Sequence, residues 1–361
     1  MSYKIFHFVS SLNVGGAERF ALDLAITQKS IGHSVEVIST GSHDEFLVQE
    51  AFSLKVPVNV MPSGRIKIYR RILFLVRGSN KIILHIHSPY VLLLLAPILL
   101  VLKYYGVKLI YTRHGSDPLA KLKWFICHRW ARYFIDETTF VSQSGLDVFH
   151  KNHCWPKSSL SLIKNGVLIP CRQRYENSEK DNNKKILRLG SVGRLVSIKA
   201  QIHLLKAVSM LSKEEKNKVE IHIYGDGPDR EMLENYVDSS LTDVKVFLYG
   251  MILDREKIYS SIDLLVMCSE TEGLSMSIME AMARNVPVIA TDVGDSAKLV
   301  LPELTGSLYK YDDIDNLAKL IKHYMAEDDV RLAQGQNAKK HIQDNYSILE
   351  TAELYDACYE R

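Results

Sequence analysis

Two carboxylates eight positions apart, Glu272 and Glu280, are the residues of this chain best suited to chemistry. Gly273 follows the first carboxylate, and a run of good helix formers leads to the second. Apolar runs at residues 262–267 and 286–291 flank the pair, so the pattern predicts strand, loop, helix and strand in that order. Because a glycine turn lets N–H groups at the helix start point back toward the loop, this unit suits a phosphate group. We therefore expect Glu272 in a loop and Glu280 on a helix, at the strand ends where ligands bind.

The second carboxylate also fits a purely structural role. Ser277 and Glu280 have the spacing of a capping box, in which the carboxylate binds the backbone at the start of its own helix. Either Ser275 or Ser277 can supply the side-chain cap of that helix. The spacing alone leaves a capping role and a ligand-binding role for Glu280 open.

Two cations follow another predicted strand, at residues 186–192. Arg194 and Lys199 are five positions apart in the loop after this strand, which can bring both onto one pyrophosphate. Fixed cations in a dry cleft stabilise the negative charge that develops when a nucleotide diphosphate leaves. A pair of ordinary surface cations would show the same spacing, so this pattern also has a structural alternative.

Three histidines, His85, His87 and His114, come at or just after predicted strand ends in the first half of the chain. An imidazole can move a proton or bind a ligand there, although a single histidine is more often structural. Asp117 follows closely and can take a proton from the hydroxyl group of a substrate as a base. If the site transfers a group, His87 and Asp117 are candidates for the side that binds the acceptor of that group.

Two further motifs favour structural explanations. The segment from Gly225 to Gly227 follows a predicted strand, but the third glycine of a dinucleotide-binding fingerprint is missing. Asp313 and Asp315 match a metal-binding Asp-x-Asp motif, yet they lie at a predicted helix start, where acids complement the helix dipole. The five cysteines include no Cys-x-x-Cys pair, which indicates reduced thiols. We therefore expect neither a metal nor a nicotinamide cofactor.

Strands alternate with helices along most of the chain, which predicts an α/β fold with parallel, doubly wound sheets. With 361 residues, the chain is long enough for two such domains. A polar, highly charged stretch near the middle has no apolar periodicity and is the best linker candidate. The expected organisation is a first domain at residues 1–171, a linker at 172–185, a second domain at 186–346 and a terminal helix at 347–361.

The chain has no apolar segment long enough to cross a membrane as one helix. The longest uncharged apolar run, residues 91–102, is too short and predicts a buried helix instead. The first residues have the pattern of a short strand that runs into a glycine loop, unlike an apolar signal segment. We therefore expect the protein in the cytoplasm.

The net charge of +3 conceals an asymmetry between the two halves. Residues 1–171 contain 20 lysines and arginines against 10 acids, whereas the remainder contains 25 against 32. Six of these cations, from Arg65 to Lys81, are interleaved with apolar residues and have no acid among them. Such a segment can lie on an anionic membrane surface, or it can be the solvated flank of an ordinary helix. We expect peripheral attachment to the inner face of the cytoplasmic membrane, and no nucleic-acid partner.

The order of these motifs resembles that of the retaining glycosyltransferases of family 4. The resemblance implies the GT-B fold, in which two Rossmann-like domains face each other across a cleft. It further implies no metal, a nucleotide sugar held mainly by the second domain, an acceptor held mainly by the first, and a terminal helix that crosses back onto the first. The segments that carry it are Gly15-Gly16-Ala17-Glu18, His114-Gly115, Val141-Ser142, Asn165-Gly166-Val167, Gly193-Arg194-Leu195 with Lys199, Gly225-Asp226-Gly227-Pro228, and the stretch from Glu272 to Glu280.

The resemblance also implies a role for each site residue. Arg194 and Lys199 neutralise the diphosphate, and His114 lies beside the donor sugar. Glu280 accepts hydrogen bonds from ribose hydroxyls, and Glu272 accepts them from hydroxyls of the transferred sugar. Backbone groups approach the phosphates at Gly15, Gly16, Gly273, Leu274 and Ser275. Family members often carry an aromatic residue and a second glycine where this chain has Leu274-Ser275, which affects the fit to the sugar.

The activity that the resemblance implies is metal-independent sugar transfer with retention of configuration. The donor is a nucleotide-diphosphate sugar, expected to be UDP-linked, and it serves as a co-substrate in place of a cofactor. The basic first half favours a lipid-linked, lipopolysaccharide-type or polysaccharide acceptor. Front-side attack is expected, because no carboxylate stands out as the nucleophile of a double displacement. Two alternatives stay open: a nucleotide-sugar epimerase of the same fold, and a non-catalytic scaffold that binds nucleotide sugars.

Overall fold

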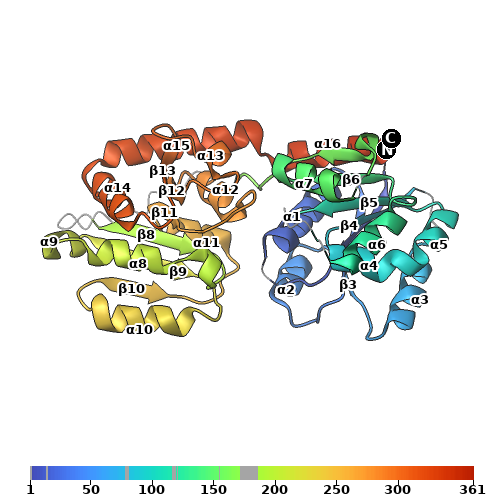
Figure 1. Ribbon diagram of the computed structural model, residues 1–361, viewed down its shortest axis with the longest axis horizontal. Coiled ribbons are helices and arrows are strands. Elements are labelled where there is room, and N and C mark those ends of the chain that lie inside the picture. Colours follow the sequence, from blue (N-terminus) through green and yellow to red (C-terminus); the bar gives the residue numbers. More distant parts are fainter. Residues whose placement is uncertain are drawn as a thin grey trace. The chain divides into compact units, whose positions relative to one another are not determined.

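The computed structural model describes residues 2–13, 15–77, 81–115, 119, 121–153, 155–170 and 186–361 (Figure 1). The chain divides into two compact units. The first unit comprises Met1–Gly166 together with Ile348–Arg361, and the second comprises Val167–Ser347. The linker expected at residues 172–185 lies outside the described residues.

The first unit is built on a seven-stranded parallel sheet with the strand order β3-β2-β1-β4-β5-β6-β7. Strands that alternate with helices form parallel sheets because each helix carries the chain back to the starting edge. The strands are β1 (Lys4–Val9), β2 (Ser34–Ser39), β3 (Val58–Val60), β4 (Ile82–Ile86), β5 (Lys108–Arg113), β6 (Glu137–Phe140) and β7 (Leu160–Leu162). The helices are α1 (Gly16–Ser30), α2 (Phe46–Ser53), α3 (Arg65–Leu75), α4 (Pro89–Leu95), η1 (Ala96–Ile98), α5 (Leu99–Tyr104), α6 (Leu122–Ala131), α7 (Gln143–His153), η2 (Lys157–Ser159) and α16 (Ile348–Glu360).

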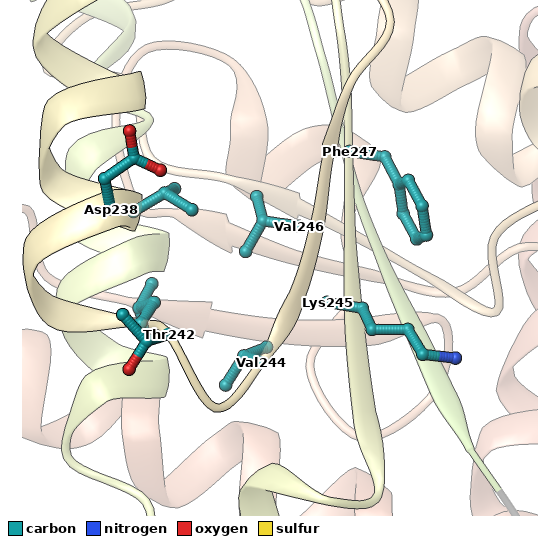
Figure 2. Close-up of a pocket in the computed structure, with 8 residues that line it drawn as sticks. Asp238, Thr242, Val244, Lys245, Val246 and Phe247 are labelled. Carbon is teal, nitrogen blue, oxygen red and sulfur yellow. The ribbon is translucent and has the colours of Figure 1, made fainter.

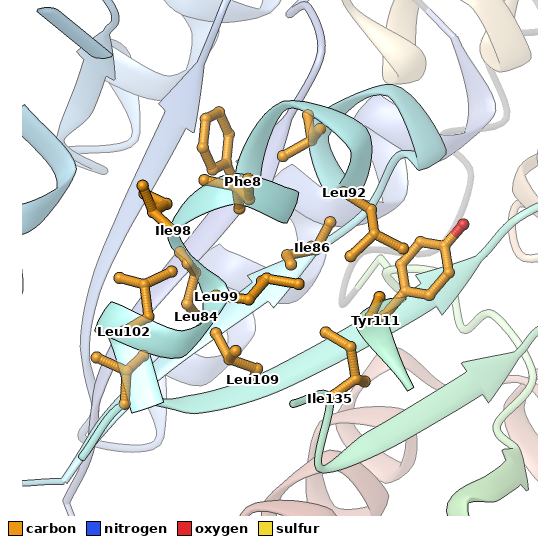
Figure 3. Close-up of a cluster of buried hydrophobic side chains, with 14 of the residues drawn as sticks. Phe8, Leu84, Ile86, Leu92, Ile98, Leu99, Leu102, Leu109, Tyr111 and Ile135 are labelled. Atoms are coloured by element: carbon orange, nitrogen blue, oxygen red, sulfur yellow. The ribbon is translucent and has the colours of Figure 1, made fainter. Parts of the chain in front are cut away.

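One face of this sheet carries a continuous apolar core. Side chains of β1, β4 and β5 pack there with those of α4, η1 and α5, as Figure 3 shows for Phe8, Leu84, Ile86, Leu109 and Tyr111. Successive side chains of a strand point to opposite faces, so the intervening positions belong to the other face. Polar residues fill several of those positions, and they are described with the functional site below.

The apolar run at residues 91–102 is not one helix, contrary to expectation. It is divided into α4, η1 and α5, and Pro97 lies in η1. Proline has no N–H to donate to the preceding turn, so a regular α-helix does not continue through it. Every helix in the described part of the chain is too short or too polar to span a membrane.

The C-terminal helix α16 packs within the first unit, against α1 and the polar face of the sheet. The Tyr355 hydroxyl lies 3.1 Å from Thr112 Oγ1 and 3.2 Å from Thr139 Oγ1. Asp356 Oδ2 lies 2.9 Å from His33 Nε2, at the start of β2. These contacts attach α16 to β5, to β6 and to the residue that precedes β2.

The second unit repeats the architecture with a six-stranded parallel sheet in the order β10-β9-β8-β11-β12-β13. The predicted fold class, an α/β chain with two Rossmann-like parallel sheets, is therefore confirmed. The strands are β8 (Leu187–Val192), β9 (Val219–Tyr224), β10 (Lys245–Leu248), β11 (Leu264–Met267), β12 (Val288–Thr291) and β13 (Gly306–Tyr309). The helices are η3 (Ser197–Lys199), α8 (Ile202–Ser209), α9 (Lys213–Lys216), α10 (Arg230–Ser240), α11 (Arg255–Ser260), α12 (Met276–Met282), α13 (Ser296–Leu299), α14 (Ile314–Ala326) and α15 (Asp328–Asn345).

Candidate functional site

Lys199 and Glu272 form an ion pair at the carboxyl ends of β8 and β11. The Lys199 ammonium lies 2.5 Å from Glu272 Oε1, and the Ser269 hydroxyl donates to the same oxygen at 2.7 Å. The Glu272 side chain is almost fully covered, whereas that of Lys199 keeps about a fifth of its surface exposed. The structure thus brings together two of the predicted site residues, 73 positions apart in the sequence.

The loop that carries Glu272 is held by two close backbone contacts. The N–H of Glu270 donates to the carbonyl of Ile198 at 2.9 Å, which attaches this loop to η3. Gly294 has a φ of +57°, and a Cβ at that position would come within 1.8 Å of the Glu272 carbonyl oxygen. Only glycine fits such a close approach, because the Cβ of any other residue would overlap the Glu272 carbonyl oxygen.

The close contact at Gly294 leads to a specific prediction. Gly294→Ala is expected to displace the Glu272 loop, lower the free energy of unfolding by about 1–3 kcal/mol and reduce turnover. Urea unfolding and steady-state kinetics measure the two effects. Gly106→Ala is the matched control, because Gly106 has a φ of +72° but no atom within 4 Å of its would-be Cβ. Equal losses in both variants would show that backbone strain alone, and not the contact with Glu272, sets the effect.

Glu280 lies on α12, as predicted, and its carboxylate is buried. The Tyr259 hydroxyl donates to Glu280 Oε2 at 2.8 Å, and Arg255 lies 3.4 Å from Oε1. Burial, and then the charge of Glu280, raise the pKa of Tyr259 well above its usual value. The tyrosine therefore stays protonated and acts as a donor to the carboxylate.

The capping-box alternative for Glu280 is wrong. Helix α12 begins at Met276 with Ser275 as its N-cap, and Ser275 makes no side-chain capping hydrogen bond. The Ser275 and Ser277 hydroxyls instead lie 3.2 Å from each other. Because the Glu280 carboxylate points to α11 and not to its own helix start, it does not act as a cap.

Arg194 differs from Lys199 in its surroundings. Its side chain is exposed and makes no hydrogen bond or ion pair with any of the described residues. Its backbone nevertheless belongs to a closely packed loop. Gly225 lies so near the neighbouring Gly193 that a Cβ on Gly225 would come within 1.9 Å of the Gly193 carbonyl oxygen. The N–H of Leu195 also donates to the carbonyl of Asp226 at 3.0 Å. The glycines of the incomplete fingerprint thus let two loops pack together, and Arg194 is presented on the outer side of this packing.

The glycine loop of the first unit leads into α1. Gly15 is the N-cap residue of this helix, and Gly16 is its first residue. The carboxylate of Glu45 accepts hydrogen bonds from the Leu12 N–H at 2.5 Å and from Asn13 Nδ2 at 3.3 Å. Glu45 is buried, and its carboxylate fixes the position of this loop through these hydrogen bonds. The sequence contained no local signal for this role.

His87 and His114 lie together in the first unit. His87 Nδ1 is 3.1 Å from His114 Nε2, and His87 Nε2 is 2.9 Å from His7 Nδ1. Burial lowers the pKa of His114 to about 3, with a smaller contribution from Arg113, and burial lowers the pKa of His7 to about 4. These imidazoles are therefore neutral near pH 7. Asp117, the other acceptor-side candidate, lies outside the described residues.

A basic and apolar surface, hereafter the α3–α6 surface, covers the helices α3, α5 and α6 of the first unit. The cations of α3 are exposed and form no ion pair with the described residues; they are Arg65, Lys67, Arg70 and Arg71. Large apolar and aromatic side chains of α3, α5 and α6 are also exposed; they include Ile66, Phe74, Leu100, Tyr104, Leu122, Ile126 and Trp130. Tyr69 of α3 donates to the carbonyl of Leu94 in α4, and Trp130 of α6 donates to the carbonyl of Ala96 in η1, so α3 and α6 are both bonded to the segment that leads into α5.

A separate groove of about 480 Å³ lies between α10 and the edge strand β10 (Figure 2). Figure 2 shows Asp238 on α10 and Val246 on β10, with Thr242 and Val244 in the segment that connects the helix to the strand. The residues that line this groove include none of the predicted site residues.

The Asp-x-Asp motif has a structural role. The Asp313 carboxylate accepts the Asn316 N–H at 3.0 Å and caps α14.

Known proteins resemble this chain over both units. A family model described as glycosyl transferases group 1 matches residues 172–341, and one described as Glycosyltransferase Family 4 matches residues 14–168. The poly(ribitol-phosphate) alpha-N-acetylglucosaminyltransferase of Staphylococcus aureus (strain COL) is 28% identical over 190 residues. That alignment covers 52% of this chain but 37% of the relative, so this chain matches little more than a third of that protein.

Two other matches extend over almost the full length of both partners. A Campylobacter jejuni protein, GalNAc-alpha-(1->4)-GalNAc-alpha-(1->3)-diNAcBac-PP-undecaprenol alpha-1,4-N-acetyl-D-galactosaminyltransferase, is 26% identical over 358 residues, 94% of each chain. The crystal structure of Anabaena HepE in complex with UDP-glucose superposes with a TM-score of 0.81 over 98% of both chains, at 18% identity. At that identity the structural match establishes the fold, and it agrees with the two parallel sheets described above.

Proposed function

We propose that this chain, a glycosyltransferase that matches the Family 4 model in its first unit and the group 1 model in its second, transfers a sugar from a nucleotide-diphosphate donor to a glycolipid or polysaccharide acceptor. The observation that carries this proposal is the ion pair of Lys199 and Glu272, supported by Ser269. An ammonium next to a carboxylate offers one group for a phosphate and one for a sugar hydroxyl, the two parts of the donor that meet at the reacting carbon.

The donor is proposed to be UDP-linked. The neighbour of the same fold from Anabaena was crystallised with UDP-glucose, which supports this choice of base. The buried Glu280 carboxylate, held by Tyr259 and Arg255, is proposed to accept hydrogen bonds from the ribose hydroxyls. Exposed Arg194 and the pair-forming Lys199 then neutralise the diphosphate from the loop after β8.

The reaction is proposed to proceed with retention of configuration and without a metal. The acceptor hydroxyl attacks the anomeric carbon on the face from which the diphosphate leaves. The bond between that carbon and the β-phosphate oxygen breaks, the new glycosidic bond forms, and the hydroxyl proton passes to the departing diphosphate. Lys199 offsets the charge on this leaving group, where a fixed donor is most effective. A product with inverted anomeric configuration would contradict this mechanism.

A panel of nucleotide sugars, each incubated with and without a bacterial lipid extract, tests the proposed function. Release of nucleotide diphosphate only with the extract supports sugar transfer. A new nucleotide-sugar isomer without the extract would instead identify an epimerase, the alternative with the same fold. Binding without turnover under both conditions would identify a scaffold. Paired phosphate cations beside a carboxylate favour an enzyme, because a protein that only binds the donor does not need to stabilise a leaving group.

The acceptor is proposed to be lipid-linked, with the α3–α6 surface lying on the inner face of the cytoplasmic membrane. The exposed apolar side chains can enter the interface between headgroups and acyl chains, while the four exposed cations of α3 contact anionic headgroups. The undecaprenol-linked substrate in the name of the Campylobacter jejuni relative supports an acceptor of this type.

Removal of the four α3 cations should release the protein from anionic membranes. Replacing Arg65, Lys67, Arg70 and Arg71 by glutamine is expected to lower binding to phosphatidylglycerol-containing liposomes by roughly 100- to 1,000-fold, at about 1 kcal/mol per cation. Flotation measures the bound fraction. The control variant replaces the exposed Lys206, Lys213, Lys319 and Lys340 of the second unit, with the same change in net charge. Equal binding of both variants would refute attachment through this surface.

A further inference from the structure

A line of buried polar side chains leads through the first unit to His114. His7 Nε2 lies 2.8 Å from Gln28 Oε1, His7 Nδ1 lies 2.9 Å from His87 Nε2, and His87 Nδ1 lies 3.1 Å from His114 Nε2. Gln28 belongs to α1, whereas the three histidines come from β1 or from the ends of β4 and β5. Gln28, His7 and His87 are buried, so no bulk water competes for these bonds.

The amide of Gln28 gives this line a direction. Its Oε1 faces His7, and its Nε2 donates to the Tyr359 hydroxyl on α16 at 3.1 Å. An amide oxygen only accepts hydrogen bonds, so His7 must carry its proton on Nε2. His7 Nδ1 then accepts from His87 Nε2–H, and His87 Nδ1 in turn accepts from His114 Nε2–H. By this sequence of bonds, the lone pair of His114 is on Nδ1.

Each imidazole carries a single proton, because burial is the largest cause that lowers the pKa of all of them. For a neutral imidazole, the choice between two tautomers decides which nitrogen donates and which accepts. Which of the two ring nitrogens carries the proton is set by the hydrogen bond that the opposite ring nitrogen makes. The position of the Gln28 oxygen therefore determines, two histidines away, what His114 offers to a ligand.

We propose that Gln28, His7 and His87 are positioning residues that hold His114 as its Nε2–H tautomer, with Nδ1 as the acceptor for a hydroxyl of the bound sugar. Within the described part of the chain, His114 Nδ1 is a covered ring nitrogen without a hydrogen-bond partner. His114 as a whole residue is intermediate in burial, so it lies close to the surface of the first unit although this atom is covered. The tautomer follows from the free protein alone, whereas the sugar hydroxyl rests on the proposed function.

Helix α16 keeps the Gln28 amide in this orientation. The Tyr359 hydroxyl accepts from Gln28 Nε2 and lies 3.0 Å from His85 Nδ1, to which it donates its proton. His85 Nε2–H then donates to Thr112 Oγ1 at 2.7 Å. Both sides of the amide thus have partners of matching polarity, and an exchange of its oxygen and nitrogen would require every proton in the network to move.

The same cluster can be considered as a metal site. In the part of the chain that the structure describes, His7, His85 and His87 have ligand atoms within 4.8 Å of one another. Each of their ring nitrogens already has a hydrogen-bond partner, and the 2.9 Å between His7 Nδ1 and His87 Nε2 is the length of a hydrogen bond. A metal would have to replace these bonds, so the observations favour the hydrogen-bonded network.

Long-range ¹H–¹⁵N spectra of histidine-labelled protein test the proposal, because they distinguish protonated from unprotonated ring nitrogens. The His114 signals are identified by their loss in His114→Gln. In the free wild-type protein, His114 Nδ1 is expected to be unprotonated. In Gln28→Met, which removes the acceptor at nearly constant volume, both tautomers of His114 are expected. Leu24→Met, at a buried position on the same helix, is the control and should retain the wild-type tautomer.

Turnover with the donor found in the panel provides the functional readout. Gln28→Met is expected to lower kcat/KM roughly tenfold, the value of one neutral hydrogen bond, while Leu24→Met changes it little. A protonated Nδ1 in the wild type, an unchanged tautomer in Gln28→Met, or stoichiometric zinc that His85→Ala abolishes would each overturn the proposal. The spectra need no substrate, so they remain decisive even if the panel shows no transfer.

Discussion

Replacing Lys199 by methionine is expected to lower kcat/KM for sugar transfer by about 100- to 1,000-fold, the usual effect of removing one fixed donor from a developing negative charge. The physical reason is the position of the ammonium, which is carried by the turn η3 and fixed 2.5 Å from Glu272 Oε1. Most of the loss should appear in kcat, because the charge on the leaving diphosphate is larger in the transition state than in the bound donor.

Steady-state kinetics with the panel donor measure this effect, and two variants serve as controls. Lys206→Met removes an exposed lysine of α8 in the same unit and should leave kcat/KM within a factor of about two. Lys199→Arg keeps the charge but changes its geometry, so it should recover part of the rate. If Lys199→Met reduces only the stability of the protein, Lys199 serves merely as the structural partner of Glu272.

Replacing Glu280 by glutamine is expected to weaken the binding of UDP by about 10- to 100-fold, the value of hydrogen bonds to a charged acceptor. Stability should change little, because the amide oxygen still accepts from the Tyr259 hydroxyl that lies 2.8 Å away. Titration calorimetry with UDP and urea unfolding of the free protein measure the two quantities separately.

Tyr259→Phe is the matched variant for this prediction. It removes the hydrogen bond within the protein but keeps the charge of Glu280 for the ribose. We expect it to lower the free energy of unfolding by about 1–3 kcal/mol, because it leaves a buried carboxylate with one donor fewer. UDP binding should be affected less than in Glu280→Gln. The opposite result, with stability lost and binding retained in Glu280→Gln, would show that this carboxylate serves only the packing of α11 on α12.

The sequence by itself determined the local units of this protein. Apolar runs of strand length alternate with helical patterns, and this alternation is sufficient to predict two parallel α/β sheets. The position of Gly273 between two such runs predicted Glu272 in a loop and Glu280 on a helix, and both positions are confirmed. These features depend on residues within about ten positions of each other, where backbone preference and periodicity act directly.

The partners of these residues were decided only by the tertiary structure. Lys199 reaches Glu272 because β8 and β11 are neighbours in the sheet, although two other strands intervene in the sequence. Glu280 and Tyr259 also come from separate elements that the fold brings together, and so do Glu45 and the glycine loop. A side chain's partner depends on strand order and register, and a shift of one residue would turn every side chain to the opposite face.

The histidine network shows this limit most clearly. His7 and His85 are paired in register across β1 and β4, and the Tyr359 hydroxyl of α16 bonds to His85 and to Gln28, the partner of His7. The sequence marked His85, His87 and His114 by their places near predicted strand ends, but nothing in the sequence neighbourhoods of His7, Gln28 and Tyr359 indicated that they would join them. The parallel sheet and the returning helix α16 bring these distant residues together in a buried layer, where hydrogen bonds decide the tautomer of each ring.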